Sequence, residues 1–552
     1  MNIALSWRTI IRWFCTSIAT IIGGVFLGYL FFTNSIILVT ALLVIGYFAV
    51  KSVRLAFFLF IVSVPFNTFV TVQYIFPVKL TYVFFFFLVL SFIYSYSSEK
   101  REDLITKIKT PLDYLLFVVV LFIILSVFQS RFIPDNPYII QNAWRNYPWI
   151  KSITKILLLL FCISIFYLCS LLLDSKQKIK EILLVYTITA VFASVVGLGV
   201  YAVYVFFGYI TKINEHKLVV EVLGDVPRLV GTEAEPLFFG LYLLTVLPIL
   251  YALLFTQYLS KEKKQIYNTK WLFIIISVMS AALLLTSSRS AILGFFTSLI
   301  ILVFLYKEER SYKAYFKDLF YVTIDFFQQL YYFLTASKKI TAIIIICLAL
   351  IVVYGTMNIK PIAEKTGYLI EKGIIVPIVG AFNEEYSAGK YWSTKSRFIM
   401  YQYAIDAWKQ HPWLGIGYEN YNFYSGQRYY YGLYDFNLNW PEVNNFPLKV
   451  LTELGIVGFV LFLSLVLYFF YYAFQALEKT KDLFWKAVVR GYIAVAVGIS
   501  VLLLFSSNIT RIYLWISLGI FIAIVKMTNN EEEQELEDPK ENTVIDKSNW
   551  AE

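Results

Sequence analysis

Four arginines stand at positions where a chain of this composition keeps few charges, namely Arg228, Arg289, Arg397 and Arg511. Arg289 lies in the tightest place, the short polar stretch Thr286–Ser290 (TSSRS) between two apolar segments. A guanidinium group is a planar, permanently charged fork that binds phosphate oxygens in bidentate fashion. Several such groups at one membrane surface would bind a phosphorylated lipid headgroup. The alternative interpretation is that each arginine extends its charge to interfacial water.

Three glutamates supply carboxylates close to these arginines or on the same expected face. Glu233 and Glu235 follow Arg228 and precede Pro236, and Glu442 stands near the end of a long polar segment. A carboxylate at such a surface can accept a proton from a sugar hydroxyl, and its pKa is raised by burial or lowered by nearby arginines. For Glu235 a structural interpretation stays open, because an acid before Pro236 also suits the start of a helix.

Aromatic side chains complete the candidate binding surface. The segment Thr394–Gln410 is predicted to be a helix, with Arg397, Tyr401 and Trp408 near one face. Aromatic faces can stack on the C–H surfaces of sugars, which would suit a glycan-binding loop. An aromatic belt at the membrane interface is the alternative interpretation for each of them.

The elements that must position these residues are membrane-spanning helices. The chain has 552 residues, of which 59% are hydrophobic and 15% charged, whereas soluble domains are about 45–50% apolar and about 25% charged. A water-soluble enzyme is therefore excluded. Because a bilayer core needs about 20 helical residues per crossing, the apolar stretches predict about 12–14 transmembrane helices in an all-α polytopic protein. The fourteen stretches are Trp13–Phe32, Ser35–Val50, Leu55–Val70, Leu80–Tyr96, Leu112–Phe128, Ile153–Leu173, Ile182–Phe207, Leu237–Phe255, Trp271–Leu285, Ile292–Tyr306, Ile340–Tyr354, Leu448–Tyr472, Ala487–Phe505 and Ile512–Val525.

The distribution of lysine and arginine predicts how these helices are oriented. Basic residues near the ends of spans accumulate on the cytoplasmic side. Placing Arg8 and Arg12 inside and alternating brings the basic clusters, such as those at Lys176–Lys180 and Lys307–Lys317, to one face. Both termini are therefore expected in the cytoplasm, and a long, partly helical loop is expected outside.

Five parts are expected along the chain. They are N-terminal transmembrane helices (1–210), central helices with the Arg and Glu motifs (211–357) including a cytoplasmic amphipathic segment (311–337), the large extracytoplasmic loop (358–446), C-terminal transmembrane helices (447–527) and an acidic, disordered cytoplasmic tail (528–552). The tail has a net charge of −7, so the overall +10 conceals a basic membrane body of +17. This positive charge lies in short loops beside anionic lipid, and nucleic acid is not expected as a partner. All four cysteines fall in apolar spans without CxxC spacing, so neither disulfides nor a metal site is expected.

Three motifs in order resemble the O-antigen ligase and O-antigen polymerase superfamily. Thr286–Gly294 (TSSRSAILG) is similar to the family's Ser-Arg-Gly-like turn between two spans. Arg397–Gly417 (RFIMYQYAIDAWKQHPWLGIG) is similar to its loop signature, in which an Arg-led helix precedes His-Pro and Gly-x-Gly. Asn444–Gly458 (NNFPLKVLTELGIVG) resembles its re-entry motif, usually His-Asn-x-x-Leu followed by a Glu-x-Gly-like turn.

The resemblance implies a glycosyltransferase without a metal or other cofactor on the outer face of the bacterial plasma membrane. Its donor would be an oligosaccharide on polyprenyl diphosphate, whose leaving group Arg289, Arg228 and Arg397 would stabilise. Membrane lipid is a second expected partner, and a chain-length regulator protein would be a third.

The chain departs from the ligase pattern at Asn444, where the ligase motif has His. An amide does not act as a base at neutral pH, whereas an imidazole does. The carboxylates of Glu233, Glu235 and Glu442 then favour the polymerase branch, with Asn444 and Asn445 orienting sugar hydroxyls or simply capping the following helix. Two alternatives stay open: a ligase that transfers glycan to a lipid or other acceptor, and a flippase for lipid-linked oligosaccharide.

Overall fold

A computed structural model describes the chain over residues 44–66, 71–72, 78–96, 110, 112–133, 147–207, 212–213, 216–217, 220–223, 226–233, 235–259, 269–307, 392–428 and 442–537. The chain divides into two compact units, residues 1–100 and residues 101–552. The expected spans Trp13–Phe32 and Ile340–Tyr354, the first nine residues of Ser35–Val50 and the amphipathic segment 311–337 lie outside the described residues.

The first unit contains a pair of packed apolar helices. Its elements are α3 (Val53–Ser63), η1 (Val64–Phe66), β1 (Thr71–Val72), β2 (Val78–Lys79) and α4 (Leu80–Tyr96). Ser52 caps α3 by accepting a hydrogen bond from the backbone of Leu55. The Thr81 hydroxyl of α4 donates to the carbonyl of Ser63 at the end of α3 (3.1 Å), so the two helices are tied at one end.

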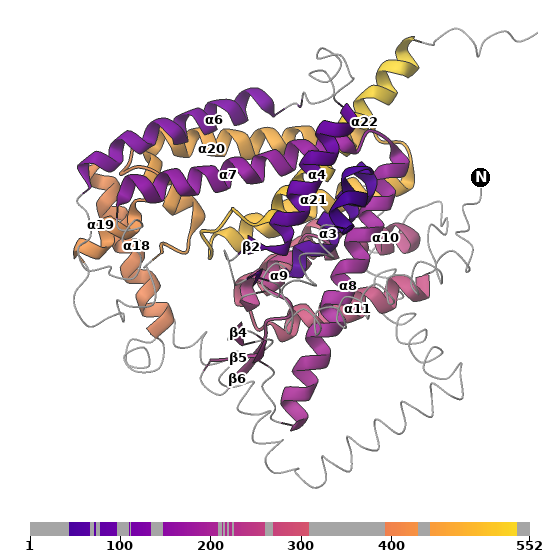
Figure 1. Ribbon diagram of the computed structural model, residues 1–552, viewed down its shortest axis with the longest axis horizontal. Coiled ribbons are helices and arrows are strands. Elements are labelled where there is room, and N and C mark those ends of the chain that lie inside the picture. Colours follow the sequence, from indigo (N-terminus) through magenta and orange to yellow (C-terminus); the bar gives the residue numbers. More distant parts are fainter. Residues whose placement is uncertain are drawn as a thin grey trace, which may run out of the picture. The chain divides into compact units, whose positions relative to one another are not determined.

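The second unit is a helical bundle that carries the candidate site (Figure 1). Its first part comprises α6 (Asp113–Ser126), η2 (Val127–Phe132), α7 (Pro148–Leu172), α8 (Lys176–Phe207), β3 (Lys212–Ile213), β4 (His216–Lys217), β5 (Val220–Leu223), β6 (Val226–Leu229), α9 (Pro236–Leu244), α10 (Leu247–Leu259), α11 (Thr269–Leu285) and α12 (Arg289–Lys307). The second part comprises α18 (Trp392–Gln410), α19 (Tyr421–Arg428), α20 (Phe446–Lys479), α21 (Leu483–Leu503) and α22 (Ile512–Glu537).

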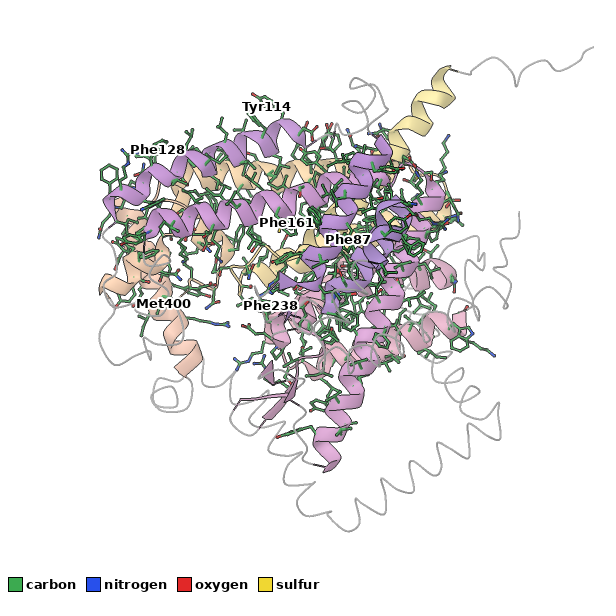
Figure 2. All side chains as sticks on the ribbon, viewed as in Figure 1. Phe87, Tyr114, Phe128, Phe161, Phe238 and Met400 are labelled. Atoms are coloured by element: carbon green, nitrogen blue, oxygen red, sulfur yellow. The ribbon has the colours of Figure 1, made fainter. Side chains whose placement is uncertain are left out.

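Eight helices of the described chain are long and apolar enough to cross a membrane, and three shorter apolar helices accompany them. The all-α polytopic architecture predicted from composition is thereby confirmed. Side chains on their outer faces are correspondingly apolar: Tyr114 of α6 and Phe128 of the adjoining η2 are 82% and 60% exposed (Figure 2). Three short antiparallel hairpins, β1–β2, β3–β4 and β5–β6, were not anticipated from the apolar pattern.

Small residues bring the helices of the bundle into close contact. A Cβ atom on Gly294 of α12 would lie 2.5 Å from the carbonyl oxygen of Gly498 in α21, so the two backbones meet without side chains between them. Gly491 of α21 meets the backbone of Ile249 in α10 in the same way. Such approaches favour helix association inside a membrane, where hydrophobicity drives helices together only weakly.

Candidate functional site

The start of α9 gathers residues from three distant segments. The Arg228 side chain at the end of β6 donates from Nε to the carbonyl of Thr286 (3.3 Å), and Thr286 lies in the turn before α12, whose first residue is the exposed Arg289. Gly240 of α9 packs on this turn and on the start of α12, because a Cβ there would lie 3.6 Å from Oγ1 of Thr286 and 2.6 Å from Cβ of Ala291. The TSSRS turn therefore rests against α9.

Arg511 joins the same place from the connection between α21 and α22. Its guanidinium lies over the ring of Phe238 in α9, 3.2 Å from the ring centroid, and the Tyr513 hydroxyl donates to the Phe238 carbonyl (3.0 Å). The buried Nε of Arg511 makes no hydrogen bond to any described residue. Phe238 is one turn from Glu235, so a cation from one end of the chain stands beside the acidic start of α9.

The two acids before α9 occupy different environments. Glu233 is 5% exposed, whereas Glu235 is exposed. Glu235 is the N-cap residue, with Pro236 in the first turn, yet its side chain accepts no capping hydrogen bond. The prediction that a helix begins at Glu235 and Pro236 is thus confirmed, but the Glu235 carboxylate does not cap that helix. Together Arg228, Arg289, Arg511, Glu233 and Glu235 are named the arginine cluster.

Glu442 lies beside the α21–α22 connection that carries Arg511. The Ser507 hydroxyl donates to Oε2 of Glu442 (2.8 Å). Since Ser507 and Arg511 are four residues apart in one short connection, the structure brings Glu442 and the arginine cluster to the same end of the bundle. The two residues are 65 positions apart in the sequence, which gave no sign that they meet.

Asn444 and Asn445 lie directly after Glu442 at the entrance of α20. Asn444 has a positive φ of 51°, a conformation that asparagine tolerates better than most residues. Asn445 caps α20, because its Oδ1 accepts from the backbone N–H of Leu448 (2.9 Å). The capping interpretation therefore holds for Asn445, while the Asn444 amide donates to the carbonyl of Glu442 (3.3 Å).

The helix α18 contributes Arg397 and Tyr401 to this entrance. The predicted helix Thr394–Gln410 is confirmed as Trp392–Gln410, and the Tyr401 hydroxyl donates to the carbonyl of Asn444 (3.5 Å). Burial raises the pKa of Tyr401, opposed by the Arg397 charge and a hydrogen bond with the Asn445 side chain. Trp408 lies near the opposite end of α18, where its carbonyl accepts from His411, so Trp408 is not brought to Glu442.

The His411–Gly417 turn inserts into a break in α20. Gly455 inside α20 has φ 67° and ψ −169°, and a side chain there would meet the carbonyl oxygen of Trp413 at 2.3 Å. The turn replaces the interrupted helical hydrogen bonds: the N–H of Gly417 donates to the Glu453 carbonyl (2.8 Å), and the N–H of Ile456 donates to the Pro412 carbonyl (2.8 Å). The motifs Arg397–Gly417 and Asn444–Gly458 are thus joined by backbone hydrogen bonds. Broken helices of this kind line binding sites in membrane proteins.

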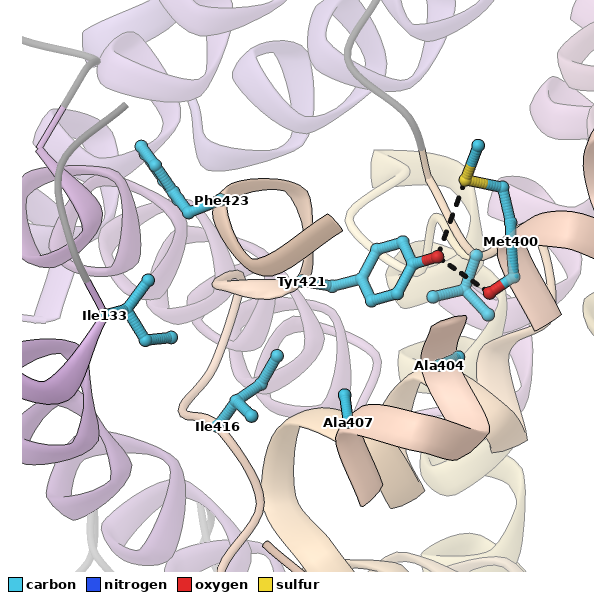
Figure 3. Close-up of a cluster of buried hydrophobic side chains, with 8 residues drawn as sticks. Ile133, Met400, Ala404, Ala407, Ile416, Tyr421 and Phe423 are labelled. Atoms are coloured by element: carbon cyan, nitrogen blue, oxygen red, sulfur yellow. Dashed lines mark hydrogen bonds between the residues drawn. The ribbon is translucent and has the colours of Figure 1, made fainter. Parts of the chain in front are cut away.

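A small apolar core holds α18, α19 and this turn together. The Tyr421 hydroxyl donates to the Met400 carbonyl (2.7 Å) and contacts its sulfur (3.5 Å), as the dashed lines in Figure 3 show. Ala404 and Ala407 of α18 and Ile416 of the turn pack in the same cluster. The Arg-led helix is thereby fixed against the turn that enters α20.

A buried cluster of charges beside this turn was missed by the sequence analysis. Lys449 of α20 lies 2.6 Å from Glu419, and Lys151 and Lys155 of α7 lie 3.8 Å and 3.9 Å from it. Glu453 accepts hydrogen bonds from the backbone N–H groups of Glu419 (2.9 Å) and Tyr421 (3.4 Å). These five charged residues, Lys151, Lys155, Lys449, Glu419 and Glu453, are named the lysine–glutamate cluster.

The neighbouring lysines favour the charged form of Glu419. Burial alone would raise the pKa of its carboxyl, but the positive charges of Lys449, Lys151 and Lys155 outweigh burial and hold the pKa below its ordinary value. Its backbone adopts φ 63°, which costs energy for a residue other than glycine. The four arginines were selected because they are basic residues at outward span ends. Lys151 and Lys449 meet the same criterion, because they stand at span ends on the face that carries Arg511.

A cavity of about 280 Å³ lies beside the lysine–glutamate cluster. Its polar end is lined by Lys155, Glu419, Glu442, Lys449, Glu453 and Ser507. Its long remainder is lined mainly by apolar side chains of α6, α7, α20, α21 and α22. The arrangement combines an elongated apolar trough with acidic and basic groups at one end, which suits an amphipathic substrate with a long hydrocarbon tail.

Among the described residues, no group of three or more His, Cys, Asp and Glu side chains is arranged to hold a metal ion. Cys162 and Cys169 are buried free thiols, while Cys15 and Cys347 lie outside the described residues. The arginine and lysine side chains named above supply positive charge near the site.

Comparison with known proteins agrees with the motifs. No curated protein matches the chain. Residues 274–463 match the model of a protein family described as O-Antigen ligase. The matched range begins in α11 and ends in the second half of α20, so it includes the TSSRS turn, α18, the His411–Gly417 turn and the break at Gly455. Over this range the chain is similar to the O-antigen ligase family, in agreement with the sequence motifs, and the described residues form eight helices long and apolar enough to cross a membrane.

Proposed function

We propose that this protein is a glycosyltransferase that polymerises polyprenyl-diphosphate-linked oligosaccharide units at the outer face of the plasma membrane. The observation that carries the proposal is the connection between α21 and α22. Its Ser507 hydrogen-bonds the Glu442 carboxylate, and its Arg511 reaches the arginine cluster at Phe238. A group that can accept a proton and groups that can stabilise an anion are thus held by one short segment.

The arginine cluster is assigned to the leaving diphosphate. When the bond between the anomeric carbon and the diphosphate oxygen breaks, its electron pair stays on that oxygen, and negative charge develops there. Arg289 at the start of α12 and Arg511, whose Nε has no described hydrogen-bond partner, can stabilise this charge where little water is present. Positioned guanidinium groups supply the stabilisation, so the proposed mechanism uses no metal or other cofactor.

Glu442 is assigned as the base. An acceptor hydroxyl oxygen forms the new bond to the anomeric carbon, and its proton passes to the Glu442 carboxylate and then to water. Of the three carboxylates at the cavity's polar end, Glu419 is engaged by lysines and Glu453 by two backbone N–H groups. Glu442 is exposed and accepts one hydrogen bond from Ser507, which leaves lone pairs for a substrate hydroxyl.

A polymerase and a ligase differ in the acceptor to which the glycan is transferred. Asn444 stands where the ligase motif has His, and its amide does not titrate near neutral pH. Tyr401 hydrogen-bonds the Asn444 carbonyl, Asn445 follows it in the chain, and the charge of Arg397 acts on Tyr401. These three residues are proposed, with Glu233 and Trp408, to contact the glycan. A chain-length regulator is proposed to act from outside the catalytic chain.

The decisive test is a product assay. Purified protein in liposomes, supplied with lipid-linked repeat units, is expected to yield a ladder of glycan chain lengths on the lipid. Transfer of a single glycan to a different acceptor, with no ladder, would instead identify a ligase. Movement of the lipid-linked unit between leaflets with no glycosyl transfer would identify a flippase and refute the proposal.

The orientation is tested separately. Both termini are proposed to face the cytoplasm, with α18 and the His411–Gly417 turn outside. Single cysteines introduced at Asp406 and at Lys178 are expected to react with a membrane-impermeant thiol reagent in whole cells only at position 406. Labelling at position 178 alone would show that the orientation is the reverse of the proposed one.

A further inference from the structure

The tip of the His411–Gly417 turn exposes two large apolar side chains. Trp413 is 67% exposed and Leu414 is 47% exposed, whereas the residues that follow them, Gly415 and Ile416, are buried. Single exposed apolar residues are common on protein surfaces, but a contiguous apolar patch marks a surface that contacts a partner. The surroundings of this tip therefore indicate what it contacts.

The tip continues an apolar stripe on α20. The N–H of Val457 donates to the carbonyl of Trp413 (3.3 Å). On one face of α20 the exposed apolar residues then follow each other as Val457, Val460, Leu463, Leu467, Tyr471 and Phe474. The stripe is about 26 Å long at 1.5 Å per residue, close to the roughly 30 Å of a bilayer core. Because α20 is long and apolar enough to cross a membrane, this stripe is the face of α20 that contacts lipid, and Trp413 lies at one end of it.

The end of α6 places the turn at the same depth. A Cβ atom on Gly417 would lie 2.8 Å from the carbonyl oxygen of Ser126, and the N–H of Tyr418 donates to the Ser126 hydroxyl (3.2 Å). Two residues beyond Ser126, the phenyl group of Phe128 is still largely exposed (Figure 2). The turn therefore lies no farther from the middle of the bundle than a lipid-facing aromatic residue of the neighbouring segment.

The exposed residues of the chain change from polar to apolar just before the tip. Lys409 and Gln410 at the end of α18 are exposed, and so is His411. The exposed residues that follow are Trp413 and Leu414. Tryptophan is enriched where lipid meets water, and a lysine beside it can extend its charge into the water. This order is typical of a segment that enters the surface of a membrane.

We propose that Trp413 and Leu414 form an interfacial membrane anchor, which inserts among the lipids of the leaflet at the entrance of α20. In the proposed orientation this is the outer leaflet. The anchor fixes the turn whose backbone pairs with the break at Gly455, so contact with lipid helps to hold the two parts of α20 in place. The anchor does not depend on the reaction, because a ligase or a flippase with this turn would need it equally.

The test measures the depth of the tip in a bilayer and does not require catalysis. In full-length protein whose cysteines are replaced by alanine, Leu414→Cys carries a nitroxide spin label in liposomes of phosphatidylethanolamine and phosphatidylglycerol. Electron paramagnetic resonance compares its collisions with oxygen, which concentrates in lipid, and with a nickel chelate, which stays in water. We expect oxygen collisions to exceed nickel collisions at position 414.

Two further label positions calibrate the measurement. Leu463→Cys, in the middle of the α20 stripe, should also show an excess of oxygen collisions, whereas Asp406→Cys on α18, an exposed polar position, should show an excess of nickel collisions.

Matched variants test whether the tryptophan supplies the anchoring. With the label at position 414, Trp413→Gln should lower the ratio of oxygen to nickel collisions, while Trp413→Phe should keep it. Ile405→Gln, which changes an exposed apolar residue of α18 away from the tip, is the control and should leave the ratio unchanged.

Three outcomes would overturn the anchor. A label at position 414 that meets the nickel chelate as freely as the label at position 406 would place the tip in water. If polysaccharide purified from the producing cells then reduced those nickel collisions, Trp413 would be a platform for stacking sugars. A label shielded from both reagents would show that protein covers the tip. Because the product assay plays no part in this test, failure of the proposed polymerase would leave the anchor standing, and the reverse also holds.

Discussion

Nζ of Lys449 lies 2.6 Å from Oε1 of Glu419, and both side chains are buried. The pair ties the first turns of α20 to the turn that precedes α19. Because Asn444 and Asn445 directly precede α20 and the turn is paired to the break at Gly455, this ion pair holds the entrance of α20 in the place where Glu442 meets Ser507. A contact within the lysine–glutamate cluster thus supports the proposed catalytic end.

Removal of this carboxylate should destabilise the protein. In Glu419→Gln the buried lysines lose their counterion, and breaking a buried pair from one side costs about 3–5 kcal/mol. Thermal unfolding in detergent should show a lower midpoint than the wild type. Asp406→Asn, an exposed acid on α18, is the control and should unfold like the wild type. An unchanged midpoint in Glu419→Gln would show that the pair contributes nothing.

The same carboxylate predicts a loss of stability in acid. The neighbouring lysines lower the pKa of Glu419 in the folded protein, so its contribution is fully present above the ordinary carboxyl pKa, about 4.3. That contribution is lost as pH falls below this value toward the lower folded pKa. Unfolding midpoints measured from pH 7 to pH 3 should drop more in the wild type than in Glu419→Gln. Parallel curves would contradict the assignment.

The break in α20 should not tolerate a side chain. Gly455→Ala places Cβ about where the Trp413 carbonyl lies, 2.3 Å from its oxygen, and forces alanine to a positive φ, which alone costs roughly 1–2 kcal/mol. We expect lower stability and loss of transfer activity together. Gly199→Ala in α8, where no atom lies within 4 Å, is the matched control and should be neutral or stabilise by about 0.5–1 kcal/mol.

Two carboxylate substitutions should identify the base. Glu442→Gln is expected to lower the turnover number about 10²–10⁴-fold while folding is retained, since the residue is exposed and does not cap a helix. Glu235→Gln should retain most of the wild-type rate if it only borders the diphosphate. Turnover in liposomes is the measurement, with membrane insertion checked by protease protection. Wild-type rates in both variants would place the base elsewhere.

Arg289→Ala should abolish activity without affecting insertion. Loss of one donor to a developing anion costs about 10²–10³-fold in rate, and Arg289 is exposed at the first turn of α12, so the fold does not depend on burying it. Arg131→Ala, an exposed arginine at the end of η2, supplies a control without contact to the arginine cluster. Full polymer synthesis by Arg289→Ala would refute the role in leaving-group stabilisation.

Several features could be predicted because they depend on neighbours in the chain. Apolar stretches of about 20 residues predict helices, since a bilayer leaves backbone groups no other partner. The helix Trp392–Gln410 followed from local pattern, and the capping role of Asn445 from its place before Pro447. The short hairpins were missed, because strands of two to four residues leave little periodicity to detect.

The sequence by itself determined that the chain spans a membrane, where most of the described helices lie and which charged residues break the expected pattern. Only the tertiary structure decided which of them meet. Glu442 lies near Arg511 through Ser507, Lys151 reaches Glu419 across 268 positions, and Trp408 stays apart from Glu442 although it shares a helix with Arg397. The physical reason is that one-dimensional patterns report burial and local hydrogen bonding, whereas distances across a bundle depend on how helices pack and where one breaks, here at Gly455.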